Sequence, residues 1–217
     1  MIKVYGAKSS MAVLKGKVRD IRVNWLLEEL KVPYERISLD PSQKENFSEG
    51  YLKINPFGKV PSLVDDTVGA NPVTLFESGA ICEYLAGKYK KFQPEYGTAD
   101  WHIYQQWVFL ATTSIEPAAS RILMGLHFLK PGPAATEFVE SGERALVRYI
   151  PHLNSLFKTQ LYLMKSEFSV ADILLCCAFG FIDGSKCLDE AHSLKEYMAR
   201  CLDRPAYKAA YAKNGEA

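Results

Sequence analysis

The stretch that decides the fold lies at residues 55–63, which read NPFGKVPSL, and continues at residues 75–81, which read LFESGAI. The residue before a proline is restricted to extended dihedral angles, so we expect Val60 to present its N–H and C=O groups along a free strand edge. A short peptide could add to such an edge as an extra strand. The sequence leaves the isomer of the Val60-Pro61 bond open, and a cis bond would hold a tight bend at this point.

The second stretch predicts the start of a helix. The apolar residues Ile81, Tyr84 and Leu85 recur at helical spacing, which places Glu77 and Ser78 in the first turn. The N–H groups and the positive dipole end at such a turn bind carboxylates, with help from the Ser78 hydroxyl. The Glu77 side chain could accept a hydrogen bond from a ligand ammonium. The two stretches together predict a site for a ligand that has a peptide backbone and an amino acid head group.

Both stretches also have a purely structural interpretation. Val60-Pro61 could be an ordinary corner between a loop and a strand, and Glu77 and Ser78 could be favourable residues for starting a helix. The occurrence of both features at this spacing favours the binding site.

The composition indicates a globular protein with a small-molecule partner. The chain has 217 residues, a net charge of +1 and 24% charged residues, so we expect neither nucleic acid nor a membrane surface as its partner. It has no apolar run long enough to span a bilayer. Residues 1–5 (MIKVY) read as a strand rather than a secretion signal, so we expect a cytoplasmic location.

The cysteines and histidines argue against a metal or redox site. The five cysteines are odd in number, form no C-x-x-C pair and lie mostly in apolar helical stretches, so we expect reduced, packed thiols. The four histidines have no ligand spacing. We therefore predict no bound metal.

The order of the predicted elements indicates an α/β domain followed by helices. The first part of the chain reads as strand, helix, strand, helix, strand, strand and helix, at residues 2–6, 21–30, 34–39, 46–53, 62–64, 73–75 and from about 77 onward. This order predicts a small mixed sheet with a parallel first pair and an antiparallel hairpin. After a linker at 90–98, we predict a helix over 99–129 that is kinked at Pro117 and a helix over 134–161 that is distorted at Pro151.

A further helix start is predicted at residues 168–173, which read FSVADI. Ser169 is an N-cap there, and Asp172, three residues later, can reach back to close a capping box. The apolar run 173–179 indicates a helix that is buried on most sides, so we interpret this cap as structural.

These motifs together resemble those of the cytosolic glutathione transferases, and the similarity spans nearly the whole chain. Residues 1–89 resemble the thioredoxin-like, glutathione-binding domain of that family, and residues 99–217 resemble its all-helical domain, with 90–98 as the linker. The Ser169 box, Tyr162-Leu163 and the run RPAY at 204–207 resemble the bacterial members.

The resemblance implies an enzyme that uses glutathione as a co-substrate, without a metal. Such enzymes conjugate the glutathione thiolate with small, mostly hydrophobic electrophiles in detoxification, commonly as homodimers. The resemblance assigns Lys59 to the glycyl end of glutathione, Val60 to backbone pairing with the cysteinyl unit and Pro61 to holding the turn. It assigns Glu77 and Ser78 to the glutamyl head.

The pocket for the second substrate is predicted from two aromatic residues. Tyr104 and Trp107 lie one turn apart on a helix and could form a wall of the pocket. A position in the core is the alternative for both residues.

The residue that activates the thiol departs from the family pattern. In the family, a Ser, Cys or Tyr commonly lies about four residues before the pattern that here reads RVNWLLEEL at 22–30, and this chain has Val18 at that position. A lengthened loop at 7–17 contains Ser9 and Ser10, either of which could approach the thiol, and we slightly prefer Ser10. Arg19 could stabilise a thiolate by charge, and Tyr5 is a third candidate.

The missing donor keeps two further functions open. The chain could use glutathione for another reaction, such as ether cleavage, dehalogenation, peroxide reduction or isomerisation. It could also be a non-catalytic protein that binds glutathione or another protein, because a fold alone does not fix a function.

Overall fold

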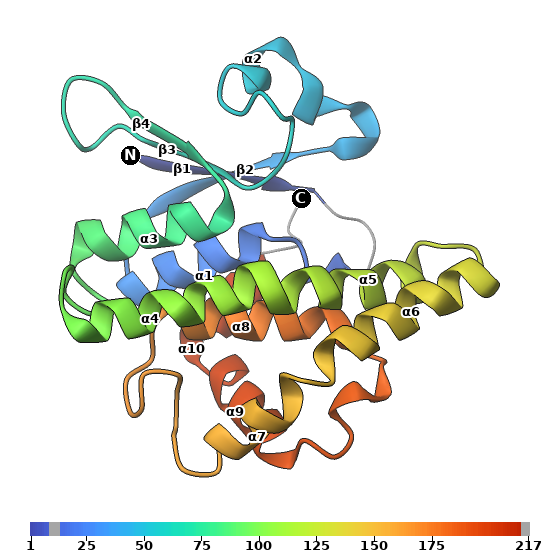
Figure 1. Cartoon of the computed structure of the whole chain (residues 1–217). Helices are drawn as coiled ribbons and strands as arrows, with labels where there is room; N and C mark the ends of the chain where they lie inside the picture. The colour runs from blue at the N-terminus through green and yellow to red at the C-terminus, as the bar shows by residue number, and fades with distance from the viewer. Residues whose placement is uncertain (9–13, 214–217) are drawn as a thin grey trace. The chain divides into compact units, whose positions relative to one another are not determined.

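The computed structural model describes residues 1–8 and 14–213, which divide into two compact units. The first unit comprises Met1–Lys91 and the segment from Pro205 onward, and the second comprises Phe92–Arg204. In Figure 1 the chain runs from the blue and blue-green α/β part into the green to orange helices of the second unit.

A four-stranded mixed sheet forms the centre of the first unit (Figure 1). Strand β1 (Ile2–Ala7) pairs in parallel with β2 (Tyr34–Leu39) and antiparallel with β3 (Ser62–Asp65), which pairs with the edge strand β4 (Val73–Phe76). Helix α1 (Asp20–Leu30) connects β1 to β2, α2 (Glu49–Leu52) follows β2 after short 3-10 turns at 41–43 and 45–47, and α3 (Ser78–Tyr89) follows β4. The predicted α/β class and the predicted element order are confirmed.

Apolar side chains of the sheet and of two helices form the core of the first unit. The residues of β1 alternate between buried and half-buried, as expected for a strand whose two faces differ. Val4 of β1, Leu63 of β3, Leu26 of α1 and Ile81 of α3 are fully buried. The core thus fixes α1 and α3 on the sheet, and with them the loops that lead into these helices.

Helix α10 (Pro205–Lys213) belongs to the first unit and packs against α1. The Tyr207 ring meets the Trp25 indole edge-on, with 4.8 Å between the ring centroids. The Lys213 ammonium lies 2.6 Å from a carboxylate oxygen of Glu28, 185 residues earlier in the chain. The sequence analysis placed all of residues 99–217 in the helical domain, because no local pattern reveals contacts over such a separation.

The second unit is built from helices, and its first long helix contains a π-helical turn. Helix α4 (Ala99–Phe109) continues through that turn (Leu110–Ile115) into α5 (Glu116–His127), where the sequence predicted one helix kinked at Pro117. A proline lacks the N–H that would continue the helical hydrogen bonds, so the turn before it widens.

Four further helices complete the second unit. They are α6 (Pro133–Leu146), α7 (Ile150–Leu156), α8 (Val170–Phe179) and α9 (His192–Leu202), with 3-10 turns at Gly180–Ile182 and Lys186–Leu188. The predicted helix over 134–161 is two helices, because the chain turns at 147–149, just before Pro151. No helix in the described part of the chain is long and apolar enough to cross a membrane.

Ser169 caps α8 as predicted, and Asp172 completes the capping box. The Ser169 N–H donates to Asp172 Oδ2 at 2.8 Å, and Asp172 Oδ1 accepts from the Leu163 N–H and the Tyr197 hydroxyl, both at 2.9 Å. Burial raises the pKa of the Asp172 carboxyl, although these hydrogen bonds act in the opposite direction. The box therefore connects the start of α8 to the preceding turn and to α9.

Candidate functional site

The β3–β4 hairpin brings the two decisive stretches of sequence together. Its antiparallel register pairs Ser62, the first residue of β3, with Phe76, the last residue of β4. The residues before β3 therefore lie across from the residues after β4, which puts the Val60-Pro61 corner beside Glu77 and Ser78. The ring centroids of Phe57 and Phe76, 5.5 Å apart, show that the loop before the corner reaches the end of β4.

Hydrogen bonds from α2 and its surroundings fix the loop that leads to this corner. The Lys59 carbonyl oxygen accepts from the Asn55 side chain at 2.7 Å and from the Tyr51 hydroxyl at 2.5 Å. Burial raises the pKa of the Tyr51 phenol, so this hydroxyl keeps its proton at neutral pH. The backbone on both sides of Lys59 is thus held by side chains of the first unit itself.

The sequence left the isomer of the Val60-Pro61 bond open. The Val60-Pro61 peptide bond is cis. Pro61 is buried, Val60 is half-buried and the Lys59 side chain is exposed. A lysine cation and an extended backbone segment are therefore both accessible at this edge of the first unit.

The start of α3 differs from the prediction in one respect. The sequence placed Glu77 in the first helical turn, whereas the helix begins at Ser78 and Glu77 is its exposed N-cap residue, with φ 69° and ψ 112°. A positive φ is unusual for a residue other than glycine, and such conformations are concentrated at functional sites. No local sequence pattern indicates this backbone conformation, because glutamate rarely adopts it.

Ser78 is 4% exposed, and its hydroxyl accepts a hydrogen bond from the buried Arg22 guanidinium at 3.0 Å. Because Ser78 Oγ is the acceptor, the proton of the Ser78 hydroxyl points away from Arg22. The N–H groups of the first turn of α3 have no partner within the helix. The helix start therefore combines a hydroxyl with backbone donors, which suits a carboxylate ligand.

The loop between β1 and α1 is held at both ends by Arg36, which the sequence analysis missed. The Arg36 guanidinium donates to the Ala7 carbonyl oxygen and to Asp20 Oδ2, each at 2.9 Å. Asp20 is fully buried at the start of α1, and Arg36 is 11% exposed. The only sequence signal for this pair was a basic residue inside a predicted strand, and the residues of that strand are half-buried or exposed.

Of the four candidates for the residue that activates the thiol, the structure describes Arg19 and Tyr5. Ser9 and Ser10 lie outside the described residues. Arg19 is exposed and directly precedes α1. Tyr5 pairs with Ser62 in the sheet and packs its ring 5.5 Å from that of Tyr51, so it has the environment of a packing residue.

The two residues predicted for the second-substrate pocket differ in environment. Tyr104 is fully buried, whereas Trp107 is half-buried and lines a cavity of about 600 Å³ within the second unit. The segments 92–98 and 163–169 form most of the other walls of that cavity. The role of both residues in binding a second substrate stays a prediction.

The thiols and the potential metal ligands complete the set of residues with possible chemistry. All five cysteines are free thiols, and Cys187 is the one that is half-buried rather than buried. Within residues 1–8 and 14–213, no cluster of three or more His, Cys, Asp and Glu side chains could hold a metal ion.

An α/β unit of this topology, followed by a helical unit, defines a two-domain protein of the thioredoxin-like class. Residues 10–87 match the family model of the glutathione S-transferase N-terminal domain, and residues 99–205 match that of the C-terminal domain. The chain belongs to the glutathione S-transferase family.

Relatives of this chain occur in eukaryotes and in bacteria. It is 29% identical over 186 residues to a glutathione S-transferase domain-containing protein of Dictyostelium discoideum, covering 80% of this chain and 68% of the relative. A second such protein of D. discoideum is 30% identical over 159 residues, covering 70% of this chain and 60% of the relative. The disulfide-bond oxidoreductase YfcG of Escherichia coli is 28% identical over 155 residues, which is 70% of each chain.

Solved structures of glutathione transferases share the fold. Glutathione transferase URE2P6 from Phanerochaete chrysosporium, in complex with oxidized glutathione, has a TM-score of 0.81 at 25% identity and covers 98% of this chain and 96% of its own. A family member from Pseudomonas fluorescens with two glutathione bound has a TM-score of 0.85 at 22% identity and covers 97% of this chain and 92% of its own.

Proposed function

We propose that this family member is a glutathione transferase that conjugates the glutathione thiolate with small, mostly hydrophobic electrophiles. The observation that carries the proposal is the hairpin register, which sets the Val60-Pro61 corner beside the start of α3. This pair of features offers complements for a peptide backbone and for an amino acid head group in one place.

Each proposed contact uses a group with suitable chemistry. The exposed Lys59 ammonium would bind the glycyl carboxylate, and the backbone of Val60 would pair with the cysteinyl unit at the bend that Pro61 holds. The Glu77 carboxylate would accept from the glutamyl ammonium. The Ser78 hydroxyl and the N–H groups of the α3 start would donate to the glutamyl carboxylate.

The chemical step requires a thiolate. A free thiol has a pKa of about 8.5, and each unit of depression corresponds to about 1.4 kcal/mol of stabilisation of the anion. We propose that a hydroxyl of Ser10 or Ser9, or the Arg19 cation, stabilises the glutathione thiolate. In a substitution, the thiolate sulfur forms a bond to an electrophilic carbon while the bond from that carbon to its leaving group breaks, and the leaving group departs with the electron pair. In an addition, the sulfur bonds to one atom of a double bond, the π bond breaks, and its electron pair takes up a proton.

The relative YfcG supports a second candidate, reduction of disulfides by glutathione. One glutathione thiolate attacks the disulfide and releases a thiol, and a second glutathione completes the reduction and forms glutathione disulfide. Both candidates use the same glutathione site, and they differ in the second substrate. A non-catalytic glutathione-binding protein is the remaining alternative.

The proposal extends to location and assembly. We propose a cytoplasmic homodimer whose partners are glutathione and a small electrophile, with no metal requirement and no nucleic acid or membrane partner. The net charge of +1 supports a small-molecule partner, because it supplies no strong attraction to polyanions.

Calorimetry with glutathione tests the site. We expect Glu77→Gln to weaken binding by about 1–3 kcal/mol, because the ligand ammonium loses a charged acceptor. Glu49→Gln is the matched control, since Glu49 is an exposed residue of the first unit that pairs with Lys53. Equal affinity in wild type and Glu77→Gln would exclude the proposed site.

Two assays then separate the reactions. Conjugation of glutathione with 1-chloro-2,4-dinitrobenzene reports transferase activity, and reduction of bis(2-hydroxyethyl) disulfide reports oxidoreductase activity. Conjugation that exceeds the uncatalysed rate supports the transferase. Disulfide reduction without conjugation supports the second candidate, and glutathione binding without either activity supports the non-catalytic alternative.

A further inference from the structure

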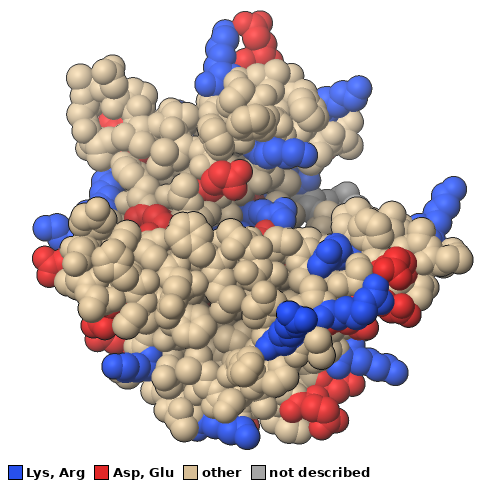
Figure 2. All heavy atoms as spheres, viewed as in Figure 1, with Lys and Arg blue, Asp and Glu red and all other residues tan. Residues whose placement is uncertain are grey.

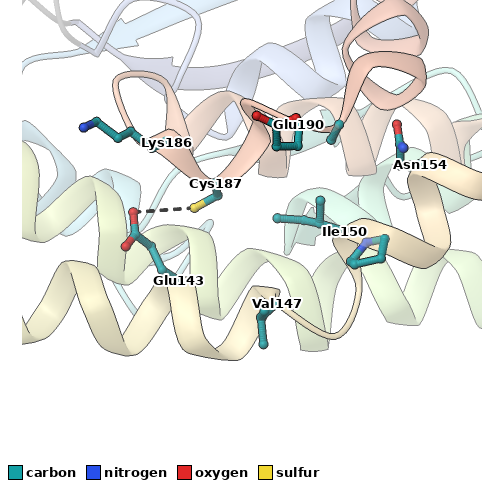
Figure 3. Close-up of a pocket in the computed structure, with 9 residues that line it drawn as sticks. Glu143, Val147, Ile150, Asn154, Lys186, Cys187 and Glu190 are labelled. Atoms are coloured by element: carbon teal, nitrogen blue, oxygen red, sulfur yellow. Dashed lines mark hydrogen bonds between the residues drawn. The ribbon is translucent and has the colours of Figure 1, made fainter.

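The second unit contains a cavity of about 490 Å³ that the proposed function does not use. It lies between α6, α7 and the segment that joins the Lys186–Leu188 turn to α9, and Figure 3 shows it from close by. Cavities of about 300–1,000 Å³ are typical of small-molecule sites. All of its lining residues belong to the second unit, whereas the proposed glutathione residues belong to the first.

The walls of the cavity are mostly apolar. The apolar part is formed by Val147, Ile150, Pro151 and Ala191, and the polar Asn154 also lines the cavity. Ile150 and Ala191 are 8% and 3% exposed, so both are packed into the second unit at the cavity wall. An apolar ring or chain would be desolvated against these walls, which is favourable in proportion to the area buried.

Carboxylates supply most of the charge at the rim. Glu143 Oε1 accepts from the Ser185 hydroxyl at 2.8 Å and from the Cys187 thiol at 3.7 Å, and Figure 3 shows Glu143 and Cys187 pointing toward each other. These two donors are neutral, so the charge of Glu143 is not compensated by them. Glu190 also lines the cavity.

The two carboxylates of the cavity have no direct ionic partner in the described part of the chain. Among the described residues, neither Glu143 nor Glu190 forms an ion pair. Lys186 is the one basic lining residue, but it is exposed, and its side chain extends away from Ile150 in Figure 3. The cavity thus combines an apolar interior with two carboxylates that form no ion pair with a described residue.

We propose that this cavity binds a small apolar amine, with its ring or chain against Ile150, Pro151 and Ala191 and its ammonium group at the Glu143 carboxylate. An ammonium donates strong hydrogen bonds to a carboxylate, and a partly desolvated site strengthens the attraction. An anionic ligand of the same shape is disfavoured by the same charges. This site is separate from the proposed glutathione site in residues and in ligand chemistry.

Cys187 provides a direct reporter of occupancy. The other four cysteines are 0–7% exposed, whereas Cys187 is half-buried at the cavity wall. An uncharged reagent such as N-ethylmaleimide is therefore expected to label Cys187 first, and a ligand in the cavity slows that labelling. Burial raises the pKa of the Cys187 thiol, so the labelling is measured at a mildly alkaline pH.

The test compares three probes of one shape: 1-naphthylmethylamine, 1-naphthylmethanol and 1-naphthoate. Intact-protein mass spectrometry follows the rate of single labelling against probe concentration in the whole protein. We expect the amine to protect Cys187 with an affinity at least about tenfold higher than that of the neutral alcohol, because only the amine gains a charge-assisted hydrogen bond. Naphthoate is expected to protect least.

Two variants test whether the Glu143 carboxylate is the group that favours the amine. Glu143→Gln is expected to remove most of the preference for the amine over the alcohol, with each labelling rate referred to that of the same variant without probe. Glu140→Gln is the matched control, because Glu140 lies on the same helix and pairs with Arg144 outside the cavity. Equal protection by the three probes, no protection by the amine, or an unchanged preference in Glu143→Gln would each overturn the proposal.

Discussion

At the scale of single residues, Ser78 connects the proposed ligand site to the core. Its hydroxyl is the acceptor for Arg22, which is 2% exposed. We expect Ser78→Ala to lower the free energy of unfolding by about 1–3 kcal/mol, because a buried charged donor loses this acceptor. Urea titration measures the loss, and Ser155→Ala, at an exposed helical serine, should leave stability nearly unchanged. Unchanged stability in Ser78→Ala would show that the Arg22 contact contributes nothing.

Asp65 makes stability depend on pH in the acid range. Burial opposes its ionisation, but hydrogen bonds from Lys88, Thr67 and Tyr84 outweigh this effect and lower the pKa of the carboxyl to about 2. The folded pKa lies below the unfolded value of 3.8, so the stabilisation is present above pH 4 and is lost as the pH falls through about 2.

We expect Asp65→Asn to remove a stabilisation on the order of 1–2 kcal/mol at pH 6 and less at pH 2.5. Urea titrations at the two pH values measure the difference. Asp66→Asn is the control, because Asp66 is an exposed neighbour whose ion pair with the chain terminus is also exposed. An equal loss in the free energy of unfolding at both pH values would contradict the lowered pKa of Asp65.

At the scale of elements, the start of α8 depends on its capping box. All ten residues of α8 are buried, so an uncapped end would leave buried donors unsatisfied. We expect Ser169→Ala to lower the free energy of unfolding by about 0.5–2 kcal/mol. Asp172→Ala should cost more, because Asp172 accepts from Leu163, Ser169 and Tyr197 together.

Thermal unfolding of these variants checks the order of the two effects. Ser166→Ala, at an exposed serine in the same segment, is the control and should unfold like the wild type. The glutathione affinity of the folded protein should not change, because the capping box contributes no residue to the proposed glutathione site. An Asp172→Ala variant as stable as Ser169→Ala would show that its additional hydrogen bonds contribute little.

The elements that local patterns define were predicted closely, and those that depend on distant contacts were not. The alternating run of β2 and the Ser169 cap are local, and both were found at the predicted residues. The backbone of Glu77 depends on how neighbouring elements pack, so the sequence analysis missed it. The distortion predicted at Pro151 is a full break of the helix at 147–149. The Arg36–Asp20 pair likewise requires β2 to lie beside β1, which only the folded sheet brings about.

At the scale of the whole molecule, charge and exposed aromatic surface bear on assembly. The chain carries 26 basic and 25 acidic residues, and Figure 2 shows both signs interspersed on the face in view. A net charge of +1 gives little repulsion between copies of the chain. In the first unit, Phe47, Phe57 and Phe76 are 57%, 64% and 37% exposed. Exposed aromatic groups of this kind mark interaction surfaces.

The proposed homodimer would cover these aromatic residues, and Phe57 is the most exposed of the three. We expect Phe57→Ser to weaken self-association by about 10-fold or more, since a buried aromatic anchor contributes about 2 kcal/mol or more to an interface. Sedimentation equilibrium measures the dissociation constant. Tyr96→Ser is the control, because Tyr96 is 79% exposed and belongs to the second unit, whereas the three phenylalanines belong to the first. A monomeric wild type would remove the homodimer from the proposal, and an unchanged constant in Phe57→Ser would place the contact on another surface.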